Sequence, residues 1–485
     1  MEFWQALVAI LGGLFGFSYA TNPFSRWTIV RRHYRAFLTD GVIQVIDNNH
    51  KLHVCNNAPM KALAAINNAI YIIWSRWHKR PTSSATTVEA IIDDIYRLRF
   101  DPNKLLLTSG DHFSSLFVRN LGVFYYPTLD THLPASEEHW QRRQLVYLQT
   151  VAYALGVFAQ TEDITTTIVP TGRYRATCVN FHAYPSDTMY GILYALAALT
   201  GVQQARPIDY GTETFPLDTH DAAQALLDSY HDSIARHYAR YRAQVFDDAS
   251  GLITKNLTMS GAKDITMRSS AFYDNVVFWK ATELAGQLGI IPHDERFLAD
   301  LKQRILETFW REDKGYFLED LSDEGIRNAY YSSDWLIVLA TNFLDPENPS
   351  ETAYFTRSIE YIQAKKIDRP FAIKYQADTR AHRQFPIVRL AVASYGGDSI
   401  WSFWGMEYIK ALLALYRVTG DANYLETADY HIDMYKKKML QYGGYPETFD
   451  AHGNLLETPL YRSIIETGWV IGFEQVLAIR ATLSS

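Results

Sequence analysis

The chain has 485 residues, a net charge of −7 and an apolar content of 48%. Its basic residues are scattered, so it lacks the positive patch that nucleic-acid binding needs. Two cysteines, Cys55 and Cys178, exclude a disulfide framework and a cysteine-rich zinc site, and we expect both to be buried thiols. Aromatic residues make up 14% of the sequence, which suits a large helical core or a carbohydrate site.

The N-terminal segment of residues 3–20 carries no charge and has about the length that crosses a bilayer at roughly 1.5 Å per residue. It lacks the basic start of a secretory signal. Arginines between residues 26 and 35 follow it, which favours a cytoplasmic protein anchored to the inner face of the membrane. A helix docked on the protein fits equally well, because the segment also contains Gln5 and three glycines.

Apolar residues recur with helical spacing from about residue 138 onward, and strand-like alternation is sparse. Roughly eleven helical segments follow, close to the dozen that six helical hairpins need. The sequence predicts an all-α fold, an (α/α)6 toroid, as a catalytic domain over residues 91–485, with an N-terminal appendage over residues 1–90. The predicted helices include His139–Phe158, Asp187–Thr200, Ala222–Gln244, Tyr273–Leu288, Phe297–Phe309, Trp335–Phe343, Trp401–Arg417 and Tyr424–Leu440.

Long connections separate several of these helices. Phe100–Asp130 and Asp247–Arg268 have some extended character, and Thr165–Tyr184 and Arg369–Asp398 are also long. Ordered long loops in a compact domain are usually functional. In a closed ring of hairpins the loops at one end converge, so we expect these segments to narrow a central funnel where distant carboxylates meet.

Two loops carry acidic residues among glycines and aromatic residues. Asp264 lies in the segment Ser260–Arg268, and Glu447 lies in the segment Gly443–Asp450. Cleavage of a glycosidic bond without metal or cofactor needs one protonated carboxyl and one ionised carboxylate. Either acid alone could be a turn or cap residue, but their joint occurrence favours a catalytic pair.

At these residues the chain resembles the six-hairpin glycoside hydrolases that include the trehalases and the α-glucosidases and mannosylglycerate hydrolases of glycoside hydrolase family 63. The trehalase acid lies in a Ser-Gly-x-Asp-x-x-x-Arg pattern, which Ser260–Arg268 resembles with one residue inserted before the Asp. Asp274 and Asn275 resemble the cluster that opens the following helix. The resemblance implies that Asp264 is the general acid.

The base of the family is a Glu in a Glu-x-aromatic-Asp/Asn-x-x-Gly turn, followed by a Gly-Trp pair. The segment from Glu447 to Gly453, with Gly468 and Trp469 after it, resembles this pattern. Glu447 would therefore be the general base. No metal or cofactor is implied.

Two further segments resemble sugar-binding parts of the family. The first spans residues 117–125 and has Asn120 where many relatives carry Asp; in the second, Trp401 lacks the proline that usually follows. Trp401 and Trp404 are three residues apart and would share a helix face, where core packing is nearly as good an explanation as sugar stacking. The resemblance covers about residues 100–480. It implies the substrate-binding residues Asp111, Arg119, Asn120, Tyr125, Arg268, Tyr273, Asp274, Trp401, Trp404, Arg462 and Trp469.

Some of these assignments have rivals. Asp111 lies in a segment that also looks like the acid motif, but it comes too early in the hairpin order, so we place it near the funnel. Weaker candidate acids are Glu162, Asp163, Asp187 and Asp334. Lys263 and Arg268 beside Asp264 would favour the ionised form of a general acid if they point inward, unless burial or the nearby Glu outweighs them.

The resulting hypothesis is an inverting hydrolase that acts on an α-glucoside or α-mannoside, either a small substrate or a chain end. Inversion requires carboxyl groups roughly 6.5–9.5 Å apart. Two alternatives stay open: another carbohydrate-active toroid, such as a debranching α-1,6-glucosidase or a β-glucan hydrolase, and an inactive sugar-binding or scaffold protein. A terpenoid cyclase is disfavoured because no Asp-x-Asp-Asp cluster occurs.

Overall fold

The fold is taken from a computed structural model of the whole chain. It describes residues 83–100, 110, 115–122, 124, 137–162, 164–172, 175–179, 185–202, 219–255, 261–263, 266–384 and 386–483, together with the backbone of two strands, Ile43–Ile46 and Leu52–Cys55. Residues 3–20 lie outside this part. Within it, no helix combines the length and the apolar character that crossing a membrane requires.

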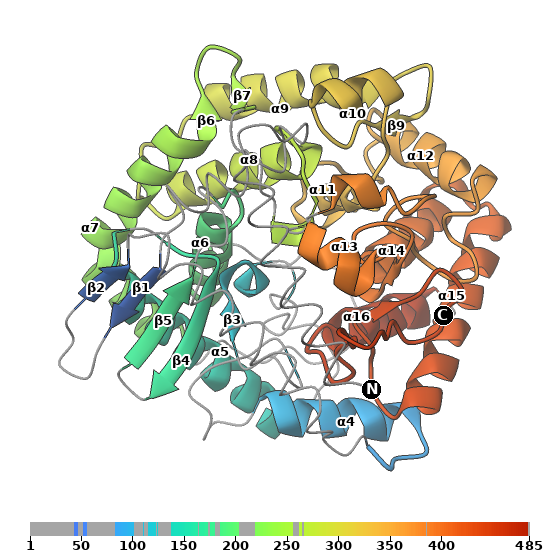
Figure 1. Cartoon of the computed structure of the whole chain (residues 1–485), viewed down its shortest axis with the longest axis horizontal. Helices are drawn as coiled ribbons and strands as arrows, with labels where there is room; N and C mark the ends of the chain where they lie inside the picture. The colour runs from blue at the N-terminus through green and yellow to red at the C-terminus, as the bar shows by residue number, and fades with distance from the viewer. Residues whose placement is uncertain are drawn as a thin grey trace.

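Paired helices form a ring, with one member of each pair outside and the other inside (Figure 1). This confirms the predicted all-α toroid. The outer helices in the described part are α5 (Glu137–Phe158), α7 (His220–Val245), α9 (Glu295–Phe309), α12 (Thr352–Ala364) and α15 (Ala422–Tyr442). The inner helices there are α6 (Thr188–Leu199), α8 (Phe272–Gln287), α11 (Ile337–Ala340), α14 (Ser402–Thr419) and α16 (Val470–Thr482).

Inner and outer helices differ in how their apolar residues are distributed. Every residue of α6 is buried, since the helix packs against α5, α7 and α8 and against η1. Helix α9 buries a single stripe at helical spacing, made of Leu298, Leu301, Ile305 and Phe309. A helix that is apolar all round belongs in the interior, whereas an amphipathic one covers a core. Helix α6 therefore lies in the inner layer of the ring and α9 in the outer layer.

Helix α4 (Val88–Arg99) closes the ring between the last helices and α5. The Tyr96 hydroxyl donates to Glu474 of α16 at 2.5 Å, and Arg143 of α5 forms an ion pair with the same carboxylate at 3.3 Å. Residue 90 falls inside α4, and the division into residues 1–90 and 91–485 remains a prediction.

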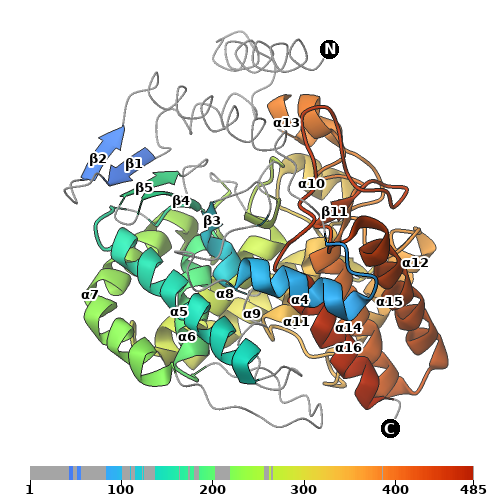
Figure 2. The ribbon, with the colours of Figure 1, turned by 90° about the horizontal axis from the view of Figure 1, so that it is seen from below.

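A five-stranded antiparallel sheet lies on one side of the helical ring (Figure 2). Its strands run in the order β2 (Leu52–Cys55), β1 (Ile43–Ile46), β5 (Arg175–Val179), β4 (Thr167–Gly172) and β3 (Leu116–Phe117). The segment Thr165–Tyr184, expected as a loop, is thus largely a β-hairpin, because it is rich in β-branched residues. Cys178 of β5 is buried and free, as expected.

The remaining elements are short and connect the helices. They are η1 (Val118–Leu121), β6 (Phe246–Asp247), β7 (Leu252–Ile253), η3 (Gly261–Lys263), β8 (Trp310–Arg311), β9 (Tyr316–Phe317), α10 (Asp323–Asn328), η4 (Ser333–Leu336), η5 (Ala381–Arg383), α13 (Pro386–Val392), β10 (Ile400–Trp401) and β11 (Thr448–Phe449). The helix predicted over Trp335–Phe343 is shorter than expected, with η4 ahead of α11. Trp401 is also outside the helix predicted for it.

Candidate active site

Glu447 is held at the start of α14 by backbone pairing. Its carbonyl oxygen accepts from the Ser402 backbone N–H at 3.0 Å and from the Ser402 hydroxyl at 2.9 Å, and its own N–H donates to Ile464 at 2.8 Å. One residue later, Thr448 of β11 pairs with Trp401 of β10. The side chain of Glu447 is partly exposed. The predicted base therefore lies next to the predicted tryptophans.

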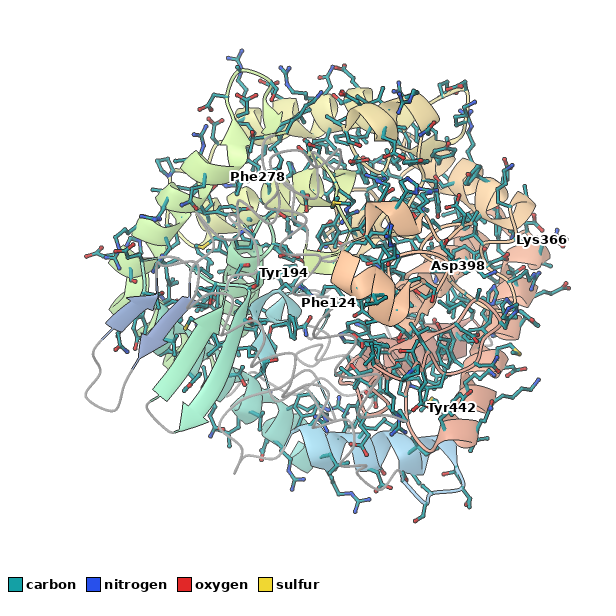
Figure 3. All side chains as sticks on the ribbon, in the orientation of Figure 1. Phe124, Tyr194, Phe278, Lys366, Asp398 and Tyr442 are labelled. Carbon is teal, nitrogen blue, oxygen red and sulfur yellow. The ribbon has the colours of Figure 1, made fainter. Side chains whose placement is uncertain are left out.

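Aromatic rings surround this point. Trp401 lies in β10 and Trp404 in the first turn of α14, so the prediction that they share a helix face is wrong. Trp401 still lies 6.1 Å, centroid to centroid, from Trp469. Phe124 packs 5.3 Å from Trp469 and 6.3 Å from Trp404, and it is near the middle of the ring, whereas Lys366 is at the rim (Figure 3).

One of these tryptophans has an unused donor. The indole nitrogen of Trp401 donates to the Tyr395 carbonyl at 2.9 Å, which fixes the ring. The indole nitrogen of Trp469 is buried and has no hydrogen-bond partner. Buried donors are usually paired, so an unpaired one near the centre suits a ligand oxygen.

Tyr375, which sequence reasoning missed, connects this aromatic group to the segment of Asp264. Its ring lies 5.0 Å from that of Trp401 and 6.4 Å from that of Trp404. Its hydroxyl donates to the carbonyl of Ala262 at 2.5 Å. Asp264 itself lies outside the described residues, as do Asp111 and Tyr125.

Three buried carboxylates come from different inner elements. Asp187 directly precedes α6, Asp274 lies in the first turn of α8 and Asp334 lies in η4. The Tyr273 hydroxyl donates to Asp187 at 3.3 Å, and the Tyr273 ring is 6.2 Å from that of Trp404. Predicted substrate-binding residues on α8 and α14 therefore meet on the inner side of the ring.

Asp274 has an unusual environment for a carboxylate. Its side chain is 1% exposed, and Ser186 donates to it at 2.7 Å. Burial raises its pKa to about 7, with Asp187 and Asp334 adding to the rise, while Arg268 and the Ser186 hydrogen bond oppose it. A carboxyl with such a pKa can hold a proton near neutrality.

The two cations beside Asp264 in the sequence have other carboxylate partners. Arg268 forms an ion pair with Asp334 at 2.5 Å, and Lys263 donates to Glu319 at 2.6 Å. The Arg268 guanidinium keeps its Nε and Nη2 without a hydrogen-bond partner, although the residue is buried. The predicted role of Arg268 in binding substrate stays a prediction, and its observed contact is structural.

Arg119 and Asn120 lie in η1, which packs against α6. Asn120 is buried, and the Arg119 guanidinium lies 4.9 Å from the centroid of the Phe117 ring. The positive charge of Arg119 also acts on the hydroxyl of Tyr273, lowering its pKa against the stronger effect of burial. Arg119 is therefore close to Tyr273 of α8.

Arg462 lies further from the centre. It follows Tyr461, whose ring is 5.1 Å from that of Tyr395, and Tyr395 in turn lies 4.8 Å from Trp401. The Nε of Arg462 is buried and has no hydrogen-bond partner. Its predicted contact with a substrate hydroxyl is compatible with this position.

No protein-family model matches the sequence, and neither does any curated protein. Among solved structures, a rhamnosidase from Klebsiella oxytoca with rhamnose bound is 13% identical, with a TM-score of 0.46 over 82% of this chain and 64% of that one. This chain thus spans less than two thirds of the rhamnosidase.

A cellobiose 2-epimerase from Bacillus thermoamylovorans is 11% identical, with a TM-score of 0.47 over 86% of this chain and 99% of that one. A cellobiose 2-epimerase from Spirochaeta thermophila is 11% identical, with a TM-score of 0.47 over 83% of this chain and 100% of that one. Likenesses at this level leave the function to be inferred from this chain's own residues.

Proposed function

We propose that this protein is an inverting glycoside hydrolase in which Asp264 is the general acid and Glu447 the general base. The observation that supports this most is a series of contacts joining the segments of the two acids. Ala262, two residues before Asp264, accepts from the Tyr375 hydroxyl, the Tyr375 ring packs on Trp401, and Trp401 pairs with the residue after Glu447.

In the proposed reaction, Asp264 gives its proton to the glycosidic oxygen as the bond to the anomeric carbon breaks. Glu447 takes a proton from the water that attacks the opposite face of that carbon. This single displacement inverts the configuration and needs about 6.5–9.5 Å between the two carboxyl groups. Trp401, Trp404 and Trp469 would stack on the sugar ring and exclude bulk water.

The substrate in this proposal is an α-glucoside or α-mannoside, which rests on the resemblance to family 63 and the trehalases. Arg119, Asn120 and Arg462 would bind its hydroxyl groups. A debranching or β-glucan-cleaving enzyme and an inactive sugar-binding protein are the other outcomes of the test below. Association with the inner face of a membrane through residues 3–20 is part of the same proposal.

The decisive experiment is proton NMR of the first-formed product on a panel of α- and β-linked glycosides. We expect the product anomer to have the opposite configuration to the substrate. General acid and base groups typically contribute 10²- to 10⁴-fold, so Asp264→Asn and Glu447→Gln should each lose about that much activity. The control is Asp433→Asn, an exposed position on α15, which should keep full activity.

Retention of configuration would rule out the single displacement. Full activity of Asp264→Asn or Glu447→Gln would rule out the assigned pair. Binding without turnover on every glycoside, unchanged in Glu447→Gln, would favour the sugar-binding alternative.

A further inference from the structure

The described residues on either side of Asp264 are fixed by hydrogen bonds. The Thr266 N–H donates to the Lys263 carbonyl at 3.0 Å. Before Asp264, the Ala262 carbonyl accepts from Tyr375. After it, Met267 exchanges two hydrogen bonds with Arg383, from its N–H to the Arg383 carbonyl at 2.8 Å and from the Arg383 guanidinium to its own carbonyl at 3.0 Å.

Glu319 is the carboxylate to which the described residues on both sides of Asp264 lead. It follows β9 and is fully buried, and it accepts from Lys263 at 2.6 Å, from Arg383 at 2.9 Å and from Arg380 at 3.1 Å. Arg268 lies 3.9 Å away. One side chain therefore connects the segment around Asp264 with the segment around η5.

The Lys263 ammonium is fully occupied by this arrangement. An ammonium has three donors, and besides Glu319 they reach Ser332 at 3.3 Å and Gln376 at 3.1 Å. Burial lowers the pKa of Lys263 to about 8, and Glu319 opposes that fall. Burial alone would raise the pKa of Glu319, but Lys263, Arg383 and Arg380 bring it well below its usual range.

The buried charges around Glu319 are nearly balanced. The cations facing it are Lys263, Arg268, Arg380 and Arg383. The other carboxylates are Asp320, which pairs with Arg383, Asp334, which pairs with Arg268, and the exposed Asp378, which pairs with Arg380 at 2.7 Å. Without Glu319, four cations would face only two buried carboxylates and one exposed one. Arginines cannot lose their protons in a protein, so this positive field would persist at any working pH.

We propose that Glu319 is a positioning residue that holds the residues flanking the general acid, Lys263 and Met267, and neutralises the cations that face Glu319. The inference rests on the proposed function, because it concerns the acid of that reaction. A protonated general acid needs a site that is not strongly positive, since nearby cations favour the ionised carboxylate. Glu319 would supply that condition while holding the residues on both sides of Asp264 in place.

The test compares Glu319→Gln, Glu319→Asp and wild type. Glu319→Gln should lower kcat roughly 10- to 100-fold, because the acid is misplaced, and should move the alkaline limb of the kcat/KM profile down by about one pH unit. Glu319→Asp keeps the charge but shortens the reach, so kcat should fall while the alkaline limb stays. If Glu319 only stabilised the fold, its two variants would not separate the fall in kcat from the shift of the alkaline limb.

Hydrogen exchange provides a readout that is independent of activity. Exchange of the Thr266 and Met267 amides should be faster in both variants, whereas amides of α9 and α12 should be unchanged. The matched control is Glu351→Gln, which removes a carboxylate from the Lys302 ion pair of 2.8 Å on the outer ring. It should alter neither the pH profile nor exchange at Met267.

The outcomes separate this inference from the proposed function. If wild type hydrolyses glycosides but Glu319→Gln leaves both the alkaline limb and Met267 exchange unchanged, the positioning role is wrong. The same holds if Glu319→Asp shifts the limb as far as Glu319→Gln. If wild type hydrolyses no glycoside, the proposed function fails, and exchange still decides whether Glu319 holds the residues flanking Asp264. Should Glu319→Gln not fold, exchange in Glu319→Asp decides alone.

Discussion

Asp274 combines near-complete burial with two neighbouring carboxylates and a single nearby guanidinium. Its pKa of about 7 in the folded protein is above the value of 3.8 that an Asp has in the unfolded chain. Between those values the unfolded chain releases the proton and the folded protein keeps it, so stability is full below about pH 4 and falls as the pH rises toward 7. We expect Asp274 to destabilise the protein by about 1.4 kcal/mol for each pH unit in that window.

Urea unfolding of wild type and Asp274→Asn at pH 4, 5.5 and 7 measures this contribution. The difference between the two free energies of unfolding should move in favour of the variant as the pH rises. The exposed Asp433→Asn should show no such trend. A difference that stays constant across the three pH values would contradict the raised pKa.

Sequence reasoning proposed acidic residues that stand out from their neighbours in the chain, and it missed an acidic residue whose partners are distant in the chain. Glu447 stands among glycines and aromatic residues, so its neighbours in the chain already point to it. Glu319 stands in a Phe-Leu-Glu-Asp-Leu stretch that suggests an ordinary turn. Its cationic partners are 56 residues away at Lys263 and 64 at Arg383. Only the fold brings them together, so no local pattern could have indicated its burial.

At the scale of elements, two glycines on inner helices face different surroundings. A Cβ on Gly191 of α6 would lie 2.3 Å from the Val118 carbonyl oxygen of η1, whereas a Cβ on Gly472 of α16 would make an ordinary 3.5 Å contact with Met406. Gly191→Ala should therefore destabilise the protein by about 1–3 kcal/mol through overpacking. Gly472→Ala should be neutral or stabilise by up to about 1 kcal/mol.

Thermal and urea unfolding of the two variants measure their stability. Both variants add the same methyl group, so a difference between them reflects its surroundings. Gly191→Ala should also reduce sugar affinity, because η1 carries Arg119 and Asn120. Equal stability of the two alanine variants would show that η1 can shift away from α6 without lowering the free energy of unfolding.

Helices were easier to predict than the segments between them. Outer helices such as α9 repeat apolar residues every three or four positions, and the predicted Phe297–Phe309 agrees with α9 to within two residues at its start. The hairpin of β4 and β5 was missed because its pairing partners β1 and β3 are themselves short and distant in sequence. Trp401 continues an apolar helical pattern, yet pairing with Thr448 takes it into β10.

For the whole molecule, stability depends on the seam where α4 and α5 meet α16. Arg143 is 2% exposed and has Glu474 as its charged partner. Glu474→Gln would leave a buried guanidinium without a carboxylate, which typically costs about 3–5 kcal/mol. The free energy of unfolding should fall by that order, while Glu426→Gln, an exposed position on α15, should change it by less than about 0.5 kcal/mol.

Limited proteolysis of both variants would show where the loss occurs. Cleavage next to α4 should be faster in Glu474→Gln and unchanged in Glu426→Gln. Unaltered stability of Glu474→Gln would mean that apolar packing alone closes the ring.

The seam joins Tyr96 to Glu474 across 378 residues of chain. At about 5–20 residues per second, a ribosome needs roughly 20–75 seconds to deliver the second partner after the first. During that interval α4 lacks α15, which packs against it in the finished protein. The apolar face of α4 therefore stays uncovered until α15 has been synthesised, and a chaperone that binds it over that period would raise the yield of closed molecules.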